Sequence, residues 1–301
     1  MVPTDDAQVA PSEVPAGGCR LGDMSHTHDD PYDLGLGHDL ATLGDQQRRH
    51  RDRRAVLGLI GVGGAGVGAA LLVGGGGAQA TTVLSRAAAS CGDEIPTETA
   101  GPFPGDGSNG PDVLLEDGIV RRDITTSIGT ASGTAPGVAL RFSLTLQDAA
   151  TCEPVKGLAV YAWHCDRDGR YSMYSDGVED ENYLRGVQVS DKAGVVTFRS
   201  IYPACYSGRW PHIHFEVYRS KAEATSSGEI VLTSQLALPR KPSMNVYRRA
   251  DGYEASVANL ERVSISSDNV FGDDDGVHQI ATVTGSVSQG YRARLTVPID
   301  L

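Results

Sequence analysis

Short runs of alternating hydrophobic and polar residues recur between turn signals from about residue 120 to the end of the chain. Six of these runs are rich in β-branched or aromatic residues and have a period near two, which is typical of strands. They lie at residues 138–146, 158–163, 195–198, 213–218, 230–233 and 293–297. Asp168-Gly169 and Ala193-Gly194 indicate tight turns between runs. Long helical periods are scarce, and only residues 252–262 predict a short helix.

This pattern predicts an all-β fold for residues 81–301: a single-domain antiparallel β-sandwich with long loops and few short helices. The composition agrees, because 37 Gly and 15 Pro against only 5 Phe suit a turn-rich β protein. Hydrophobic residues make up 40% and charged residues 21%, which argues against wholesale disorder and against a polytopic membrane protein. The net charge of −12 argues against a nucleic-acid partner.

The first 80 residues differ from the rest of the chain. Residues 1–50 are polar without a sustained apolar period and predict a disordered leader. Residues 51–80 indicate an export signal, in which Arg53-Arg54 precede a glycine-rich apolar run that ends at Ala78-Gln79-Ala80. The arginine pair resembles a twin-arginine signal. We therefore expect an exported protein, extracellular or associated with the cell envelope, with no stable membrane partner after signal cleavage.

Alternatives stay open in this segment. Residues 55–73 could just span a bilayer as a retained anchor, although their glycines disfavour a stable helix. Met24 is a second plausible start of translation, which would make residues 1–23 an over-long gene prediction. Ala88-Ala89-Ser90-Cys91 is a weak match to a lipoprotein box.

Residues 160–215 contain the candidate chemistry. His212 and His214 lie two residues apart in a predicted strand, so both imidazoles project to one face and can reach one ion. Tyr206 and Arg209 precede them, and Tyr171 follows the turn at Asp168-Gly169. A ferric ion can hold a phenolate at neutral pH, although the pKa of a free phenol is about 10. Zinc prefers Cys, His or carboxylate, so two Tyr and two His indicate Fe(3+), one per chain.

This stretch resembles the core signature of the intradiol ring-cleavage dioxygenases, the family of protocatechuate 3,4-dioxygenase and catechol 1,2-dioxygenase. The core matches are residues 163–172, 185–188 and 206–215, and further matches lie at 97–103, 122–124, 234–235 and 268–271. The resemblance covers about residues 91–300. It implies an enzyme that cleaves catechol-type rings between the two hydroxylated carbons (intradiol) with O2, giving cis,cis-muconate-type dicarboxylic acids.

The resemblance also implies roles for single residues. The iron ligands would be Tyr171, Tyr206, His212 and His214, with Tyr206 and His214 axial. Catechol would displace Tyr206, whose released phenolate would accept a substrate proton. Arg209 would stabilise developing negative charge, and Gln235 would polarise the intermediate or position O2.

Other polar residues of these segments have no matched catalytic role. We expect His164 to be a packed strand residue and His278 a loop residue, and we expect Arg122-Asp123 to be a structural pair. Phe103 and Tyr174 are candidates for the pocket wall by position alone. The preferred catechol and the oligomeric state are not indicated.

Four of the five cysteines follow the predicted signal: Cys91, Cys152, Cys165 and Cys205. An even number of cysteines in an exported chain permits two disulfides. We expect Cys165–Cys205, which would tie the two tyrosine-bearing turns together, and Cys91–Cys152. Both pairs are hypotheses, because four cysteines permit three complete pairings.

Two other functional classes stay open. The fold could serve as a non-catalytic exported β-sandwich binding module, although such a module would not need four ferric ligands and Arg209. A zinc or copper hydrolase could use His212 and His214, although no third His or carboxylate follows at a convincing spacing.

Overall fold

A computed structural model describes residues 91, 94–226 and 228–301 of the chain. The predicted leader (residues 1–50), the predicted signal segment (51–80), the alternative anchor (55–73) and the alternative start at Met24 all lie outside these described residues. Within the described part, no helix is both long enough and apolar enough to cross a membrane.

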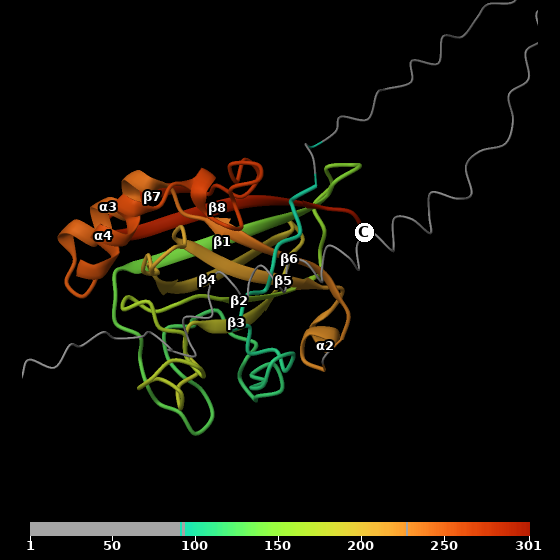
Figure 1. The fold of residues 1–301 in the computed structure, drawn as a ribbon. Coiled ribbons are helices and arrows are strands. Elements are labelled where there is room, and N and C mark those ends of the chain that lie inside the picture. Colours follow the sequence, from blue (N-terminus) through green and yellow to red (C-terminus); the bar gives the residue numbers. More distant parts are fainter. Residues whose placement is uncertain (1–90, 92–93, 227) are drawn as a thin grey trace, which may run out of the picture.

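The body of the chain is built from two four-stranded sheets that stack on each other (Figure 1). One sheet has the order β4-β1-β8-β7 and the other the order β3-β2-β5-β6. The strands are β1 (Ala139–Asp148), β2 (Ala159–Trp163), β3 (Arg185–Val189), β4 (Val195–Ile201), β5 (His212–Tyr218), β6 (Ile230–Ala237), β7 (Thr282–Ser286) and β8 (Gly290–Ile299). The predicted β-sandwich is therefore confirmed.

One pair of strands departs from the predicted antiparallel arrangement. β1 pairs with β4 antiparallel but with β8 parallel, from Leu140 opposite Tyr291 to Asp148 opposite Ile299. Parallel neighbours need a long connection, and almost the whole fold lies between these two strands in the sequence. The other pairs of named strands are antiparallel, so the predicted antiparallel sandwich holds with this one parallel pair.

The main hydrophobic core lies between the sheets. Along β1, Leu140, Phe142, Leu144 and Leu146 are buried while the intervening residues are more exposed, as a half-buried strand requires. β5 differs, because all seven of its residues are buried. Its odd-numbered side chains join the core between the sheets, so His212 and His214 project to the opposite face of the β3-β2-β5-β6 sheet.

Long loops cover that opposite face. They form a second hydrophobic cluster with the outward side chains of β2, and this cluster includes Val113, Leu114, Tyr161, Trp163 and Tyr171. In Figure 1 these loops, drawn in green and yellow-green, extend beside β2 and β3. The histidine pair therefore lies between a sheet and a layer of loops, out of bulk water.

Short helices follow β5 and β6. They are α2 (Lys221–Ala224), α3 (Arg240–Arg249), α4 (Glu254–Arg262) and the 3-10 turn η1 (Ile265–Ser267). α4 confirms the helix predicted over 252–262. α3 was not predicted, because only Ser243, Val246 and Tyr247 of its ten residues are buried and one of them is polar. α3 and α4 pack together and lie beside β7 (Figure 1).

One predicted disulfide is present and the other is absent. Cys91 and Cys152 are bonded, with their Cα atoms 5.2 Å apart. Cys165 and Cys205 are both buried free thiols. Cys165 packs in the loop-covered cluster, where its Sγ lies 3.8 Å from the Ala204 carbonyl. Cys205 packs in the core between the sheets, and its thiol donates to the Arg209 carbonyl. The Cys165–Cys205 prediction was wrong, because the two side chains belong to different layers.

Candidate metal centre and active site

Two imidazole nitrogen atoms from β5 lie close to each other. The Nε2 atoms of His212 and His214 are 3.0 Å apart, and the two side chains are 2% and 3% exposed. The spacing of two residues along a strand produces this geometry, as predicted. Burial lowers the pKa of both imidazoles, so both rings are neutral and each can offer a lone pair.

Two loops add phenol oxygens at the same point. The Tyr171 hydroxyl lies 3.3 Å from each histidine Nε2 atom and 3.4 Å from the Tyr206 hydroxyl. The Tyr206 hydroxyl lies 3.3 Å from Nε2 of His212. The structure thus brings together all four residues that the sequence suggested as metal ligands.

The spacing of these donor atoms fits a metal ion. Four ligands placed tetrahedrally about 2 Å from a metal are separated from one another by about 3.3 Å. The five separations given above span 3.0–3.4 Å. Among the described residues, no group of three or more His, Cys, Asp or Glu side chains is arranged to hold a metal. The donor set of two phenols and two imidazoles suits Fe(3+) better than zinc.

Neighbouring groups orient the two histidines differently. Nδ1 of His212 lies 2.5 Å from the Trp210 carbonyl, to which it donates, and this leaves Nε2 as the acceptor atom that faces the cluster. The His214 ring stacks on Trp163 with ring centroids 4.9 Å apart and an interplanar angle of 6°. Nδ1 of His214 is buried without a hydrogen-bond partner in the described part of the chain.

Asp166 organises the two tyrosine-bearing loops. Its buried carboxylate accepts hydrogen bonds from the backbone N–H groups of Asp168 and Arg170 and pairs with the Arg170 guanidinium at 2.9 Å. Its backbone carbonyl accepts from the N–H of Ala204, two residues before Tyr206. Sequence reasoning gave Asp166 no role. The signal available was an Asp-x-x-Gly turn directly before a candidate ligand.

Gly169 allows these two loops to approach each other. Its φ of +86° is in the left-handed region, and a Cβ atom added there would lie 3.2 Å from the Tyr206 Cβ atom. Only glycine adopts such a conformation without a steric penalty. The turn before Tyr171 therefore sets the position of Tyr206 as well.

We expect Gly169→Ala to lower turnover about tenfold, because the added Cβ atom would shift Tyr206. A displacement of about 1 Å can lower turnover 10²-fold, and the shift expected here is smaller. Gly177→Ala is the matched control, because Gly177 has a similar φ of +79° but nothing within 4 Å of its added Cβ atom. Both substitutions should cost about 1–2 kcal/mol of stability for the left-handed backbone. Steady-state kinetics and thermal melts of both variants test this, and equal turnover in the two would contradict it.

Arg209 forms a buried polar chain beside the donor cluster. Its Nε donates to the Asp268 carboxylate at 3.0 Å and its Nη2 donates to Gln235 Oε1 at 2.7 Å. Gln235, on β6 opposite His214, donates in turn to the Thr99 carbonyl. Burial disfavours the charged guanidinium, but the nearby Tyr206 oxygen and the Asp268 carboxylate outweigh burial and raise the pKa of Arg209. The predicted site residues Arg209 and Gln235 are thus in direct contact.

Asp268 was matched in the sequence but was given no role. It is 2% exposed and also accepts a 2.6 Å hydrogen bond from the Trp210 N–H. Burial by itself would raise the pKa of Asp268, but Arg209 and the Trp210 N–H hold the pKa below its usual value. A buried arginine requires such a counter-charge, although the sequence does not show which carboxylate supplies it.

Aromatic side chains form a wall next to Tyr171. The Phe103 ring lies 5.0 Å from the Tyr171 ring and 5.2 Å from the Tyr174 ring. Arg185 holds this wall in place, since its guanidinium donates to the carbonyls of Pro104 and Ser172. Phe103, Tyr174 and Tyr206 are each half-buried, whereas Tyr171 is only 2% exposed.

The remaining polar residues named from the sequence lie outside the cluster. His164 is buried just after β2 and bonds to Ser200 at 2.6 Å, which agrees with a packed residue. His278 lies in a turn between η1 and β7. Asp123 pairs with Arg199 at 3.5 Å rather than with its neighbour Arg122.

Comparison with known proteins shows which proteins the chain resembles. Residues 118–212 match the family described as Dioxygenase. A chlorocatechol 1,2-dioxygenase of Rhodococcus opacus is 35% identical over 71 residues, which is 24% of this chain and 27% of that relative's length. An intradiol ring-cleavage dioxygenase structure from Tetranychus urticae superimposes with a TM-score of 0.55 and 25% identity, covering 69% of this chain and 95% of that one.

The chain is therefore similar to dioxygenases in sequence and fold. More narrowly, its resemblance to the intradiol ring-cleavage dioxygenases, predicted from the tyrosine and histidine motifs, is confirmed.

Proposed function

We propose that the chain is an exported non-haem Fe(3+) dioxygenase that cleaves catechol-type rings between their two hydroxylated carbons. The observation that carries this proposal is the cluster of two phenol oxygens and two imidazole nitrogens, in which five of the six donor pairs are 3.0–3.4 Å apart. In the net reaction the bond between the two hydroxylated carbons breaks. Both atoms of O2 enter the product, so each of these carbons ends as a carboxyl group and no external reductant is needed.

Tyr171, Tyr206, His212 and His214 would hold the metal. When bound, a ferric ion would keep the phenols ionised, accept both oxygens of a catechol dianion and withdraw electron density from the ring. The two neutral histidines would contribute no charge of their own. The two phenolates would therefore leave the ion with one positive charge, which favours binding of an anionic substrate.

Tyr206 is the ligand best placed to accept a substrate proton. It is half-buried, whereas the other three ligands are at most 3% exposed, so it lies at the solvent side of the cluster. Its phenolate oxygen can leave the cluster toward solvent and accept a catechol proton. Tyr171, His212 and His214 have no comparable freedom.

Arg209 would stabilise negative charge that develops beside the cluster. Its charge is fixed in place by Asp268 and Gln235, so no reorganisation is needed during the reaction. Gln235 positions this guanidinium. The wall formed by Phe103, Tyr171 and Tyr174 offers an apolar surface for the flat ring of a catechol.

Two features support export. Arg53-Arg54 and the apolar run that follows are typical of a twin-arginine signal. The disulfide between Cys91 and Cys152 is of a kind that persists in oxidising compartments. The twin-arginine route carries folded proteins, so iron could be loaded before translocation.

The test is a visible absorption spectrum of the purified chain with metal analysis, before and after anaerobic addition of catechol. We expect about one iron per chain and a broad mid-visible band from phenolate-to-iron charge transfer, which shifts to longer wavelength with catechol. Oxygen uptake across a panel of substituted catechols then identifies the substrate. A protein that stays colourless after ferric reconstitution would overturn the proposal and favour the non-catalytic binding module.

A further inference from the structure

The outer face of the β4-β1-β8-β7 sheet carries a row of arginines. The inward side chains of β1 and β8 fill the core, so Arg141 of β1 and Arg292 and Arg294 of β8 project outward, and all three are exposed. Arg199 of β4 is also exposed. This face lies on the opposite side of the sandwich from His212 and His214.

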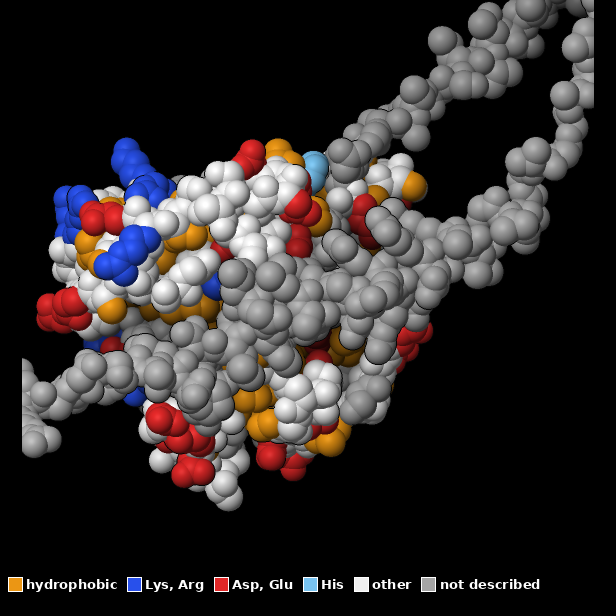
Figure 2. Space-filling model, in the orientation of Figure 1, with side chains coloured by type: hydrophobic (Ala, Val, Ile, Leu, Met, Phe, Trp, Pro, Cys, Tyr) orange, Lys and Arg blue, Asp and Glu red, His pale blue; other side chains and the backbone are white. Residues whose placement is uncertain are grey.

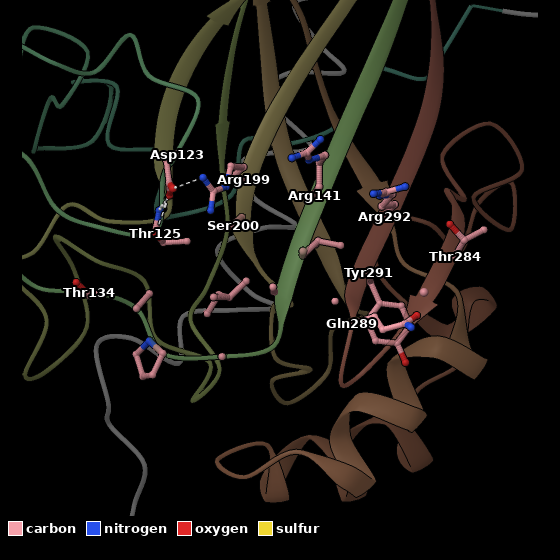
Figure 3. A pocket seen from close by; sticks show the side chains of 18 residues that line it. Asp123, Thr125, Thr134, Arg141, Arg199, Ser200, Thr284, Gln289, Tyr291 and Arg292 are labelled. Carbon is pink, nitrogen blue, oxygen red and sulfur yellow. Dashed lines mark hydrogen bonds and ion pairs between the residues drawn. The ribbon is translucent and has the colours of Figure 1, made fainter.

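Strand register places the arginines next to one another. Arg141 is the Cα partner of Arg199 on one side and of Arg292 on the other. Figure 3 shows these three side chains side by side across three neighbouring strands. One step further along β1, Ser143 lies between Thr197 and Arg294. Adjacent strands are about 4.8 Å apart, so the row presents a positive charge at nearly regular intervals.

Two grooves lie on this face. One has a volume of about 760 Å³ and is lined by Arg141, Arg199 and Arg292 together with polar residues such as Thr284 and Gln289 (Figure 3). The other has a volume of about 290 Å³ and is lined by Arg122, Arg141, Arg292 and Arg294. None of the four candidate metal ligands lines either groove.

Few acidic side chains of the described residues lie beside these arginines. Among the described residues, five arginines line the two grooves, and Asp123, which pairs with Arg199 at 3.5 Å, is the only acidic residue in either lining. No carboxylate of the described residues forms an ion pair with Arg122, Arg141, Arg292 or Arg294. Figure 2 shows other basic side chains over α3 and α4, where Arg248 is paired with Glu261 at 2.9 Å.

Such a row is costly for the sheet. Like charges directly opposite each other on neighbouring strands destabilise a sheet. The net charge of the chain is −12, so its sequence contains many acidic residues that could have been placed beside these arginines to reduce the repulsion. An anionic ligand that bridges the strands would remove the repulsion and use the bidentate geometry of each guanidinium.

We propose that this face binds an acidic polysaccharide, a linear chain of sugars that carries carboxylate groups at regular intervals. The arginines would pair with the carboxylates. Ser143, Thr197, Thr284 and Gln289 would hydrogen-bond sugar hydroxyls. This binding is independent of the proposed metal centre and would hold the protein on an anionic polymer while the opposite side faces solvent.

The lining favours this ligand over nucleic acid. Single-stranded nucleic acids are bound through aromatic side chains on which bases stack. Within the part of the chain that the structure describes, the only aromatic residue in either lining is Tyr291, which is 5% exposed and packs against Tyr202. Neutral sugars also stack on exposed aromatic rings, and no described residue that lines these grooves provides one.

The experiment measures binding of the full chain to polygalacturonate at low and at physiological ionic strength, with neutral dextran as the control polymer. We expect salt-sensitive binding to polygalacturonate and none to dextran. Arg141→Thr/Arg292→Thr/Arg294→Thr should weaken binding at least about tenfold, since each exposed ion pair contributes modestly. Threonine suits an outward strand position, so the variant should keep its melting temperature or gain stability.

A matched variant removes the same number of charges elsewhere. Lys156, Arg219 and Lys221 are exposed and line neither groove, and their triple threonine variant should bind like the parent. Polyphosphate and single-stranded DNA, tested at equal charge concentration, distinguish other sources of negative charge. Absence of polygalacturonate binding, equal losses in the two triple variants, or tighter binding of DNA or polyphosphate would each overturn the proposal.

Discussion

We expect the Tyr171→Phe variant to lose catechol turnover by more than about 100-fold, because a residue that merely orients a metal ligand is already worth about 10–100-fold. The Tyr171 hydroxyl lies within 3.4 Å of the donor atoms of Tyr206, His212 and His214, so it contacts every other donor of the cluster. The substitution removes this one oxygen and keeps the ring that packs against Phe103. Iron content per chain should fall, and the mid-visible band should weaken or disappear.

Tyr183→Phe provides the matched control for this prediction. Tyr183 is also buried, at 4% exposed, and its hydroxyl points to Asp166 Oδ2 at 3.4 Å rather than to the cluster. The control variant should keep its iron, its colour and most of its turnover. Iron analysis, absorption spectra and oxygen uptake on both variants decide the matter. Full colour and turnover in Tyr171→Phe would remove Tyr171 from the ligand set.

Strands with one buried and one exposed face could be predicted from their period, and β2 and β5, which are buried throughout, were predicted from their β-branched and aromatic residues. β1 and β8 alternate between core residues and outward polar residues, and the sequence shows this period directly. β7 was missed because Thr282–Ser286 is a short, mostly exposed edge strand with no buried apolar residue. β3 was missed because Arg185 and Gly186 break its apolar run. The buried Arg185 donates to carbonyls and hydroxyls of residues distant in the sequence.

In the candidate site, too, some features could be predicted from the sequence and others could not. The period of the strand predicts that His212 and His214 share a face, whatever the rest of the fold does. The contact between Arg209 and Asp268 joins residues 59 positions apart on different loops, and no local pattern encodes it. The Cys165–Cys205 prediction failed for a related reason, since closeness of two loops does not tell which layer each side chain enters.

Arg209→Leu should lower kcat by about 10²–10³-fold while the iron stays bound, since that is the typical cost of removing one fixed charge-stabilising donor. Arg209 is not one of the four candidate ligands, so the metal content and the visible band should persist. The spectral shift on anaerobic catechol addition should also persist, because it reports binding rather than turnover. The two variants should therefore differ: Arg209→Leu should lose activity and keep its colour, whereas Tyr171→Phe should lose both.

The same substitution should also destabilise the fold, because it leaves the Asp268 carboxylate buried without its partner. Removing one member of a buried ion pair costs about 3–5 kcal/mol. The Asp268 side chain is fully buried and that of Arg209 is 7% exposed, so solvent cannot replace the missing charge. Urea denaturation of the variant and its parent measures this loss.

The double variant Arg209→Leu/Asp268→Asn separates the two effects. It removes both charges, so it should recover part of the stability, but it should not recover turnover because the guanidinium is still missing. Asp268→Asn alone keeps the guanidinium but loosens its position, so its kcat should fall between those of the parent and Arg209→Leu. If the double variant regained turnover together with stability, the kinetic loss in Arg209→Leu would be a consequence of misfolding, and Arg209 would have only a structural role.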